Sequence, residues 1–326
     1  MKAIICTAYG PPNVLKLQEV EKPHPKDGQV LILIHATSVS RADCEIRRFD
    51  FPVWVALPLR LWLGVLKPRV RILGQEFSGE VEAIGKGVTS FAPGDRVFGT
   101  TGMGLGAYAE YLCLDQSSPG SVLTSMPANM SYAEAAVIPY GASEALRFLR
   151  KGNLKAGQNI LIIGAGGSFG TYAVQLAKLF GAEVSAVDSF SKLDILHSLG
   201  ADHIIDYTKG DFTNSMQTFD IIFDVVCKTP LTHILRMLRP GGRCVLANPH
   251  TSHLILGLWT TMTSDRKVIF GSDSGSTEHL QYIRELVETG KLQPVIDRSY
   301  PLVQMAEAHR YAETEQKKGN IVITVA

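Results

Sequence analysis

Residues 158–188 read QNILIIGAGGSFGTYAVQLAKLFGAEVSAVD, and this stretch decides the fold of the chain. The apolar run from Ile160 to Ile163 has the length of a buried parallel strand. A glycine cluster follows, and the apolar residues at positions 173, 176, 177 and 180 then recur with the spacing of one helix face. A second apolar run, Val184 to Val187, ends at Asp188. The order of strand, glycine turn, helix, strand and acid is typical of a dinucleotide-binding site.

The glycine turn favours a bound pyrophosphate, because glycines let the backbone approach the phosphates at the N-terminus of a helix. In the pattern G-x-G-x-x-G read from residue 165, Ala165 replaces the first glycine. Asp188 lies 18 residues after Gly170, near the spacing of about 20 expected for an acid that binds the adenosine ribose. The alternative is a cofactor-free α/β sheet with glycine-rich turns. We predict backbone contacts to the pyrophosphate from Gly167, Ser168, Phe169 and Gly170.

Composition excludes several classes of protein. The chain has 326 residues, is 45% hydrophobic and carries a net charge of +1, which indicates a folded protein of two ordinary domains. It has no run of lysine or arginine, so we expect no nucleic-acid partner. Its five cysteines are scattered and form no C-x-x-C pair. This usage, together with an N-terminus that does not resemble a signal peptide, predicts a cytoplasmic protein with reduced thiols.

The most apolar segment is FPVWVALPLRLWLGVL, residues 51–66. It is 16 residues long and contains Pro52, Pro58 and Arg60, whereas a spanning helix needs about 20 apolar residues. We therefore predict no integral membrane segment. Three interpretations stay open: a buried irregular segment, an apolar wall or lid over a substrate pocket, and a contact with a membrane surface.

The order of patterns predicts an α/β protein with two domains. Short strands with glycine turns in residues 2–114 indicate a barrel-like β domain. Helical spacing begins near Ser131, where Glu134 completes a capping box, and strands and helices then alternate as in a doubly wound parallel sheet. After Gly271 we expect one amphipathic helix, at about 278–288, and a last strand that returns to the first domain. The predicted domains are residues 1–124 with 273–326, and residues 125–272.

Longer stretches resemble the medium-chain dehydrogenase/reductase superfamily, and specifically its zinc-less quinone oxidoreductase-like branch. The stretches that carry this resemblance are SVSRADCEIR (38–47), ILGQEFSGEVEAIGKGVTSFAPGDRVFG (72–99), GAYAEYLCL (106–114), residues 138–184 and SLGADHIIDY (198–207). The resemblance implies a GroES-like β-barrel domain and a Rossmann domain with the active site between them. It also implies a homodimer that pairs the edge strands of two Rossmann sheets, for which Lys267 to Gly271 is the candidate here.

The metal ligands of zinc-dependent members are not matched. Those enzymes have a cysteine in the stretch matching 38–43 and a histidine within Gly-His-Glu, where this chain has Ser40 and Gln75. A hydroxyl and an amide are poor zinc ligands beside a thiolate and an imidazole. His250 and His253 form an H-x-x-H pattern, which we interpret as part of a surface loop. We predict no zinc site.

The resemblance also implies the remaining site residues. Ser40 is expected to donate a hydrogen bond to the substrate, and Asp43 matches an acid recurrent in the family that either acts in catalysis or braces the loop. Tyr140 and Ser143 are expected near the nicotinamide or substrate, although Tyr140 equally suits a core position. Val225 and Val226 are expected at the cofactor ribose, and the nicotinamide end is assigned to Ala247, Asn248, Phe270 and Gly271.

The choice between NAD and NADP is the point where residues and family disagree. Relatives place a small neutral residue where Asp188 stands, and they favour NADP. A carboxylate repels a 2′-phosphate and binds the bare ribose, so Asp188 favours NAD. Ser189, Ser191 and Lys192 follow at once and are able to hold a phosphate if Asp188 turns away.

The predicted function is an NAD(P)H-dependent reductase of a quinone or an α,β-unsaturated carbonyl compound, a small apolar electrophile. Such acceptors take a hydride with less charge stabilisation from the enzyme than the interconversion of simple alcohols and aldehydes needs, for which a Lewis acid is usual. Two alternatives remain. One is a zinc-free alcohol or aldehyde dehydrogenase, and the other is a cofactor-binding sensor or scaffold that turns nothing over.

Overall fold

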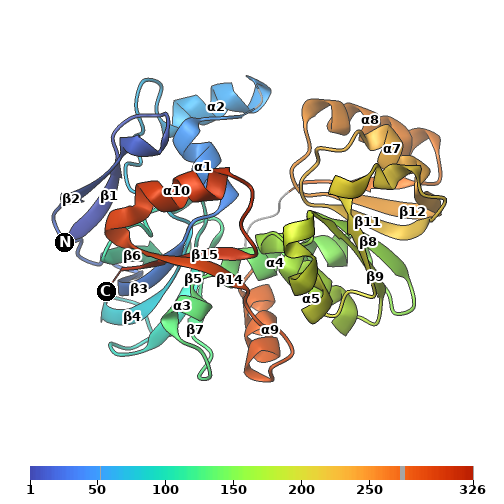
Figure 1. Cartoon of the computed structure of the whole chain (residues 1–326). Helices are drawn as coiled ribbons and strands as arrows, with labels where there is room; N and C mark the ends of the chain where they lie inside the picture. Colours follow the sequence, from blue (N-terminus) through green and yellow to red (C-terminus); the bar gives the residue numbers. More distant parts are fainter. Residues whose placement is uncertain (52, 272–275, 326) are drawn as a thin grey trace. The chain divides into compact units, whose positions relative to one another are not determined.

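The glycine-rich stretch folds as predicted, into strand β8 (Asn159–Ile163), helix α5 (Ser168–Leu179) and strand β9 (Glu183–Asp188) (Figure 1). The structure is a computed structural model that describes residues 1–51, 53–271 and 276–325. β8 and β9 pair in parallel, with Ile162 opposite Ala186. Residues 160–163 are all buried, and a strand without an exposed face needs cover on both sides of its sheet.

Two compact units divide the chain. The first unit comprises Met1–Ser143, Ser274–Thr289 and Ile296–Ala326, and the second comprises Glu144–Asp273 and Gly290–Val295. The division falls within helix α4 (Pro139–Lys151). The domain boundaries after residues 124 and 272 stay predictions, because compactness alone does not show that a segment folds independently.

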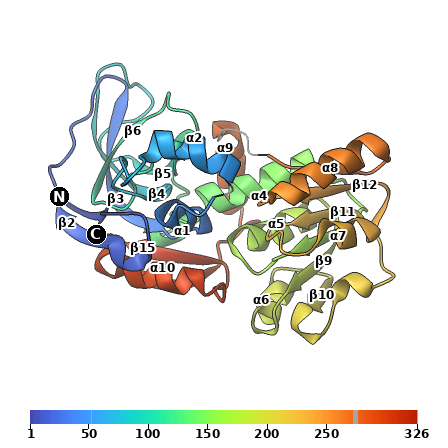
Figure 2. The ribbon, with the colours of Figure 1, turned by 90° about the horizontal axis from the view of Figure 1, so that it is seen from above.

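The second unit is built on one parallel sheet with the strand order β10-β9-β8-β11-β12-β13. Figure 2 shows most of these strands side by side. This order is that of the doubly wound Rossmann sheet, so the predicted fold class is confirmed for this unit. The strands not yet given are β10 (His203–Asp206), β11 (Phe219–Asp224), β12 (Leu238–Leu246) and β13 (Lys267–Ile269).

Helices cover this sheet: α5 packs on β8 and β9, α6 (Leu193–Ser198) on β10, α7 (Leu231–Arg236) on β12 and α8 (Thr251–Thr263) on β13. The prediction of a surface loop at His250 and His253 is wrong. His250 is the N-cap of α8, and its backbone N–H donates to Nδ1 of His253 in the first turn. Proline, threonine and serine near position 250 indicate a helix start here, because the apolar run Leu254–Leu258 follows.

The first unit contains a seven-stranded sheet in which β15 pairs with β3 antiparallel, so the end of the chain joins the N-terminal strands. The strand order is β14-β15-β3-β4-β5-β7, with β6 also paired to β3, and β1 and β2 form a separate antiparallel pair. The strands are β1 (Lys2–Cys6), β2 (Leu15–Glu19), β3 (Gln29–Ser38), β4 (Glu76–Ile84), β5 (Arg96–Thr101), β6 (Tyr111–Asp115), β7 (Ser121–Ser125), β14 (Ile296–Pro301) and β15 (Asn320–Thr324).

The helices of the first unit are α1 (Arg41–Arg48), α2 (Val53–Leu63), α3 (Tyr132–Ala135), α9 (Thr277–Glu288) and α10 (Met305–Glu313). Short 3-10 helices span Pro12–Val14, Gly102–Gly104, Phe190–Lys192, Tyr207–Lys209, Phe212–Asn214 and Leu302–Gln304 in the two units. The prediction of a single helix after Gly271 is wrong, since α10 follows α9. The buried residues of α10 include Met305, Ala308 and His309. Because Ala308 is small and His309 is polar, the sequence shows only a weak helical spacing of apolar residues here.

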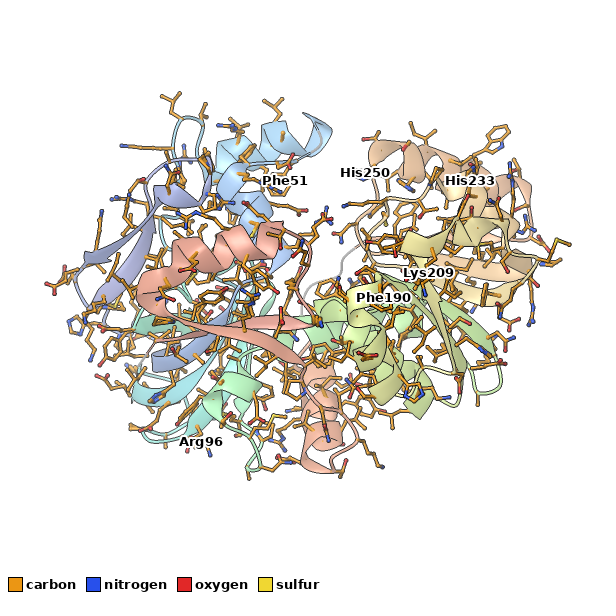
Figure 3. The ribbon with its side chains drawn as sticks, in the orientation of Figure 1. Phe51, Arg96, Phe190, Lys209, His233 and His250 are labelled. Carbon is orange, nitrogen blue, oxygen red and sulfur yellow. The ribbon has the colours of Figure 1, made fainter. Side chains whose placement is uncertain are left out.

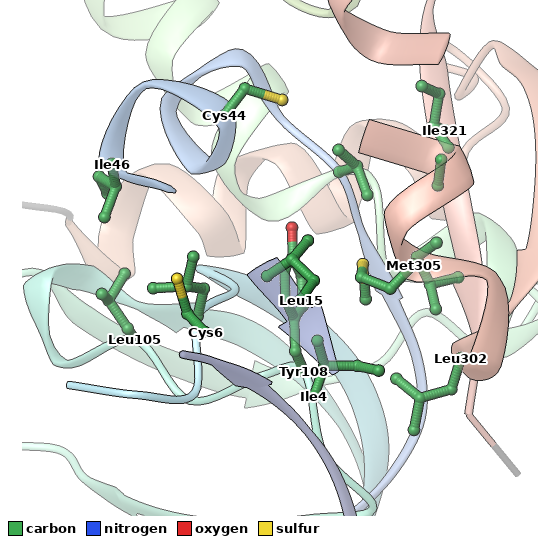
Figure 4. Packing of buried hydrophobic residues seen from close by; sticks show 14 of the residues in the cluster. Ile4, Cys6, Leu15, Cys44, Ile46, Leu105, Tyr108, Leu302, Met305 and Ile321 are labelled. Carbon is green, nitrogen blue, oxygen red and sulfur yellow. The ribbon is translucent and has the colours of Figure 1, made fainter. Parts of the chain in front are cut away.

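The main apolar cluster of the first unit brings together the N-terminal strands, α1 and α10. Ile4, Cys6 and Leu15 belong to this cluster together with Met305 and Leu302 (Figure 4). Tyr108 lies in the same cluster and is fully buried. This packing fixes α1, the helix that begins directly after Ser40.

Candidate active site

The turn between β8 and α5 brings backbone atoms close together at the N-terminus of a helix. Gly167 is the N-cap of α5, so no capping side chain bonds to the backbone N–H groups of the first helical turn. A Cβ on Gly170 would lie 2.3 Å from the Gly164 carbonyl oxygen, so the turn and the helix touch there through backbone atoms. A Cβ on Gly167 would meet that same oxygen only at 3.5 Å. The helix N-terminus is therefore approachable along Gly167, which fits a bound phosphate group.

Asp188 stands at the end of β9 with both carboxylate oxygens engaged. Oδ2 accepts from the Gly166 backbone N–H at 2.8 Å, and Oδ1 accepts from the Ser189 N–H at 2.8 Å. Lys192 Nζ lies 3.1 Å from Oδ1, and both side chains of this ion pair are buried. Asp188 thus stabilises the glycine turn through a hydrogen bond and balances the charge of Lys192. Each carboxylate oxygen has two lone pairs, so acceptor capacity for a ribose hydroxyl remains.

The residues after Asp188 form an exposed surface. The Ser189 and Ser191 hydroxyl oxygens are 3.3 Å apart. Phe190 is 67% exposed, and Lys209 Nζ lies 5.5 Å from its ring centroid (Figure 3). Hydroxyl groups, a cation and an exposed ring therefore gather where the adenosine end of a dinucleotide would lie.

Val225 and Val226 follow β11, the strand next to β8. Asp224, the last residue of β11, accepts from the backbone N–H groups of Val226 at 3.0 Å and Cys227 at 2.7 Å and so shapes this turn. The Asn248 side chain donates to the Val225 carbonyl oxygen at 2.8 Å. The structure therefore brings together the turn at 225–226 and Asn248, which were predicted from the resemblance.

Phe270 and Gly271 follow β13, at the edge of the sheet. The Gly271 carbonyl oxygen accepts from Arg147 Nη1 at 2.8 Å, and Arg147 is itself buried and bonded to Glu144. Phe270 packs against the apolar cluster of β11 and β12. Gly271 is thus held by Arg147, and Phe270 is held by packing. Ala247 is held by its backbone N–H, which donates to the Asp224 carbonyl oxygen.

In the first unit, Ser40 is the N-cap of α1 and forms a capping box with Asp43. Asp43 Oδ2 accepts from the Ser40 N–H at 2.9 Å and from the Ser40 hydroxyl at 2.6 Å. Ser40 is 9% exposed and Asp43 only 1%. Burial raises the pKa of Asp43 to about 6, against the hydrogen bonds from Ser40, which lower it. A hydroxyl group is therefore coupled to an acid that exchanges protons near neutral pH.

Glu76 lies beside this pair and was not predicted as a site residue. Its side chain accepts from the Ser38 hydroxyl and, at 3.0 Å, from the Tyr140 backbone N–H. Burial raises the pKa of Glu76 to about 7, and the charge of Asp43 adds to the rise. Glu76 therefore ties the start of α4 to the end of β3. Ser143 lies one helical turn beyond Tyr140, and both side chains are half-buried.

The residues present do not fit a zinc ion. Ser40 and Gln75 supply a hydroxyl and an amide, and the Glu76 side chain is already hydrogen-bonded. Across residues 1–51, 53–271 and 276–325, no group of three His, Cys, Asp or Glu side chains converges to hold a metal. Asp43 Oδ1 and Gln75 Oε1 are buried and lack a hydrogen-bond partner within that part of the chain.

Within the apolar segment at 51–66, Val53–Leu63 form helix α2, so the interpretation as a buried irregular segment is wrong. Leu59 and Leu63 pack against the main cluster, whereas Leu57 and Leu61 are 70% and 62% exposed. Leucine and alanine favour a helix here even with Pro58 inside it. In the described part of the chain, no helix is both long and apolar enough to cross a membrane. A role of this segment as a pocket wall stays a prediction.

Two family models match separate stretches of the chain. Residues 26–125 match the alcohol dehydrogenase GroES-like domain, and residues 199–323 match the zinc-binding dehydrogenase domain. A 2-methylene-furan-3-one reductase of Solanum lycopersicum is 31% identical, over 99% of this chain and 79% of its own. The quinone oxidoreductase structure from Coxiella burnetii is 30% identical with a TM-score of 0.89, covering 100% of this chain and 99% of its own.

The chain belongs to the medium-chain dehydrogenase/reductase superfamily, in its quinone oxidoreductase-like branch. The predicted combination of a GroES-like domain with a Rossmann sheet is thereby confirmed. A structure described as an NAD-dependent alcohol dehydrogenase is also similar, at 27% identity and a TM-score of 0.85, covering 100% of both chains. A nicotinamide cofactor follows from membership of this superfamily.

Several buried residues with polar side chains were not predicted from the sequence. Glu76 was visible within Gly-Gln-Glu, and Asp224 at the end of an apolar strand, so both gave a local signal. Tyr108 and His309 gave none. His309 Nε2 lies 3.2 Å from the Tyr108 hydroxyl, across a sequence separation of 201 residues.

Proposed function

We propose that this protein is an NAD(P)H-dependent, zinc-independent oxidoreductase that transfers a hydride to a quinone or an α,β-unsaturated carbonyl compound. The observation that carries the proposal is the Ser40–Asp43 pair, in which a hydroxyl group is bonded at 2.6 Å to a buried acid. The names of the relatives support it: one reduces 2-methylene-furan-3-one, which is an enone, and another is a quinone oxidoreductase.

The bound nicotinamide supplies the hydride. Ser40 donates a hydrogen bond to the acceptor oxygen, on which negative charge develops. Asp43 lies behind Ser40 and replaces the proton that the acceptor takes. Tyr140 and Ser143 are further candidates for contact with the substrate, since both are half-buried residues in the first turns of α4.

Residues of this chain would hold the dinucleotide. Gly167, Ser168, Phe169 and Gly170 would bind the pyrophosphate, and Asp188, Ser189 and Lys192 would bind the adenosine ribose. Val225 and Val226 would flank the second ribose, and the nicotinamide end would be lined by Ala247, Asn248, Phe270 and Gly271. The backbone contact at Gly170 and the hydrogen bonds of Asp224 and Asn248 support this assignment.

Asp188 sets a preference for NADH in this proposal. Its carboxylate repels a 2′-phosphate, and its partner Lys192 is turned inward, away from solvent. Because the ion pair is close to neutral, we expect the preference to be moderate and to depend on Lys192 staying paired.

We further propose a homodimer, formed by the edge strand β13 and the outer face of α8. Among the residues that the structure describes, β13 is the last strand of its sheet and pairs with β12 alone. Ile255, Leu258, Trp259 and Met262 on α8 are 67%, 56%, 66% and 83% exposed. Apolar side chains at helical spacing next to an open edge suit a second copy of the chain.

A cytoplasmic location is supported by five cysteines that are all free.

A zinc-free alcohol dehydrogenase is the second candidate, favoured by the similar structure described as an NAD-dependent alcohol dehydrogenase. Its chemistry is harder at this site, because an alkoxide needs strong charge stabilisation that a serine hydroxyl supplies poorly. A cofactor-binding sensor is the third possibility.

The deciding experiment follows the absorbance of NADH and NADPH with a panel of quinones, enones and simple aldehydes. Oxidation with quinones or enones and not with aldehydes supports the proposal. Turnover of aldehydes or alcohols alone supports the second candidate. Tight cofactor binding without turnover of any acceptor supports a sensor.

A further inference from the structure

Helix α2 lacks the polar outer face that a helix at the surface of a protein normally has. On its inward side, Leu59 and Leu63 pack against the main apolar cluster. Its outward side chains are also apolar, and all of them are exposed: Leu57, Pro58, Leu61 and Trp62. A helix that is apolar all round is typical of apolar surroundings on every side.

Helix α9 of the same unit shows the usual arrangement. Its apolar residues Leu280, Ile283 and Val287 are buried. Its exposed residues are all polar: Thr277, Glu278, Gln281, Glu285 and Glu288. The two helices have nearly the same length, 11 residues in α2 and 12 in α9. The apolar outer face therefore distinguishes α2 from a surface helix of its own unit.

The apolar surface continues beyond the end of the helix and then becomes basic. Val65 and Leu66 follow α2, and Leu66 is 92% exposed. Three exposed cations come next: Lys67, Arg69 and Arg71. Within the part of the chain that the structure describes, no carboxylate lies within ion-pair distance of these three side chains.

The local charge has one sign only. Residues 51–75 contain four basic residues and no acidic residue. We call this region the α2 surface, and it consists of Leu57, Leu61, Trp62, Val65, Leu66, Lys67, Arg69 and Arg71.

The carbonyl oxygens at the C-terminal end of α2 accept hydrogen bonds from protein donors. Arg69 donates twice, from Nη1 to the Leu61 oxygen at 3.2 Å and from its backbone N–H to the Leu63 oxygen at 2.7 Å. Arg60 Nη1 donates to the Val65 oxygen at 2.6 Å. Water satisfies such carbonyl groups when a helix ends in solvent, whereas a helix end in lipid needs partners from the protein. This helix end is therefore prepared for surroundings that contain little water.

The same end of α2 is anchored to the first unit. The Tyr9 hydroxyl donates to the Gly64 carbonyl oxygen at 2.9 Å. The Arg60 guanidinium lies 4.1 Å from the ring centroid of Phe49 and 4.8 Å from that of Tyr9, and a cation over an aromatic ring is stabilised. These contacts attach the helix from one side and leave its apolar outer face exposed.

The membrane-water interface of an anionic bilayer fits both the apolar and the basic part of the α2 surface. Interfacial helices bury leucine and tryptophan at the boundary of headgroups and acyl chains, while nearby lysine and arginine attract anionic lipids. With 11 residues, α2 is too short to span the bilayer and long enough to lie in this interface (Figure 1). The exposed face of α8 differs, because it lies beside an open sheet edge and is followed by the exposed acid Asp265.

We propose that the α2 surface binds the headgroup region of an anionic lipid membrane, with α2 lying in the plane of the interface. Leu61, Trp62 and Leu66 enter the boundary with the acyl chains, and Lys67 and Arg71 contact lipid phosphate groups. The membrane contact is independent of the proposed reductase activity, because none of these residues is assigned to catalysis or to the cofactor.

The test measures binding of the full chain to vesicles by co-sedimentation. Wild type should bind vesicles of phosphatidylcholine mixed with phosphatidylserine, and it should bind vesicles of phosphatidylcholine alone more weakly. Added salt should weaken binding to the mixed vesicles, because it screens the attraction between exposed cations and anionic headgroups.

A first double variant tests the apolar part. Leu61→Gln with Leu66→Gln should bind mixed vesicles about a hundredfold more weakly, because two leucine side chains no longer gain from leaving water. The matched control is Leu17→Gln with Val303→Gln, which removes two exposed apolar side chains elsewhere in the same unit. This control should bind like wild type.

A second double variant tests the basic part. Lys67→Gln with Arg71→Gln should bind mixed vesicles about thirtyfold more weakly at low salt, because two cations near the anionic surface are lost. Lys16→Gln with Lys26→Gln removes the same charge from two exposed positions of the same unit outside the α2 surface. This second control should keep nearly the full affinity of wild type.

Tryptophan fluorescence reports which helix enters the membrane. A brominated lipid in the vesicles should quench the fluorescence of wild type. Trp62→Phe should lose part of this quenching, whereas Trp259→Phe, on α8, should not.

The proposal is wrong if wild type does not bind the mixed vesicles, or if both double variants of the α2 surface bind them as well as wild type. Light scattering tests a second copy of the chain as the occupant. A lower mass for Leu61→Gln with Leu66→Gln, together with no vesicle binding by wild type, would assign the α2 surface to a protein interface instead. Circular dichroism checks that each variant is folded, and the Lys67 and Arg71 variant decides alone if the leucine variant does not fold.

Discussion

Asp188 Oδ1 lies 3.1 Å from Lys192 Nζ in an ion pair whose side chains are 5% and 9% exposed. The same carboxylate accepts from the Gly166 N–H, so one acid is bonded to both the glycine turn and the lysine. Removing one partner of a buried pair leaves the other charge uncompensated. Loss of Asp188 removes the carboxylate partner of Lys192, and a 2′-phosphate is then able to take its place.

Replacing Asp188 by serine should shift cofactor preference toward NADPH. The substitution removes the repulsion of the 2′-phosphate and releases Lys192 to bind it. We expect the ratio of kcat/KM for NADPH to that for NADH to rise by about tenfold or more, from one charge-assisted contact of about 1.4 kcal/mol or more.

The double variant Asp188→Ser with Lys192→Met is the control, because it lacks the freed cation. Its ratio should fall back toward the wild-type value. An unchanged ratio in the single variant would remove Asp188 from the ribose site.

Two glycines of the phosphate turn should respond differently to alanine. A Cβ at position 170 would lie 2.3 Å from a backbone oxygen, so Gly170→Ala should lower the melting temperature and weaken cofactor binding. A Cβ at position 167 has its nearest contact at 3.5 Å, so Gly167→Ala should fold normally and lose cofactor affinity alone. Thermal unfolding and cofactor titration, measured together, separate the two effects. Full cofactor affinity in Gly167→Ala would place the pyrophosphate elsewhere.

The stability of the chain should depend on pH through Asp43. Its folded pKa of about 6 lies above the usual value near 4 of an unfolded aspartate. The stabilisation that results is complete below about pH 4 and is lost as pH rises through about 6. The free energy of unfolding of Asp43→Asn should therefore rise by about 2 kcal/mol relative to that of wild type between pH 4 and pH 7, measured by denaturant unfolding.

The difference in the free energy of unfolding between wild type and Asp43→Asn isolates the contribution of Asp43. Glu76, with a folded pKa of about 7, acts in the same direction, and His309, with its pKa lowered to about 3, acts in the opposite direction. Both are present in each protein, so their contributions largely cancel. A difference that does not change with pH would mean that Asp43 has an ordinary pKa.

The parallel sheet was predictable because its signals are local. Apolar runs, glycine turns and a helix of regular spacing specify β8, α5 and β9 without reference to the rest of the chain. α10 was missed because its inward face contains Ala308, which is small, and His309, which is polar, so the helical spacing of large apolar residues is weak. α8 was missed because the polar residues of its first turn resemble a loop.

The site was predictable only where one segment contains it. Ser40 and Asp43 are three residues apart, and Asp188 ends a strand next to the glycine turn. Tyr108 and His309 meet across 201 residues, and no pattern in a single sequence joins two such positions. The inward turn of Lys192 is a choice of side-chain conformation, which spacing does not determine.

Ser40→Ala should reduce the turnover number while leaving cofactor binding intact. The variant loses the donor to the acceptor oxygen, for which an effect of about a hundredfold is typical of general acid catalysis. Ser40→Thr retains a hydroxyl that can cap α1 and should keep most of the activity. Because Ser40→Ala also removes a helix cap, its unfolding curve must be measured alongside. A fully active and folded Ser40→Ala would assign proton delivery to another group.

The outer face of α8 should control the oligomeric state. Trp259 and Met262 are 66% and 83% exposed there, beside the edge strand β13. Trp259→Glu with Met262→Glu places charges on this apolar face, and burying them in an interface would be costly. Light scattering should report a dimer for wild type and a monomer for the double variant. Met216→Glu is the matched control, since Met216 is 97% exposed in a segment outside α8. A double variant that keeps the wild-type mass would show that α8 lies outside any interface.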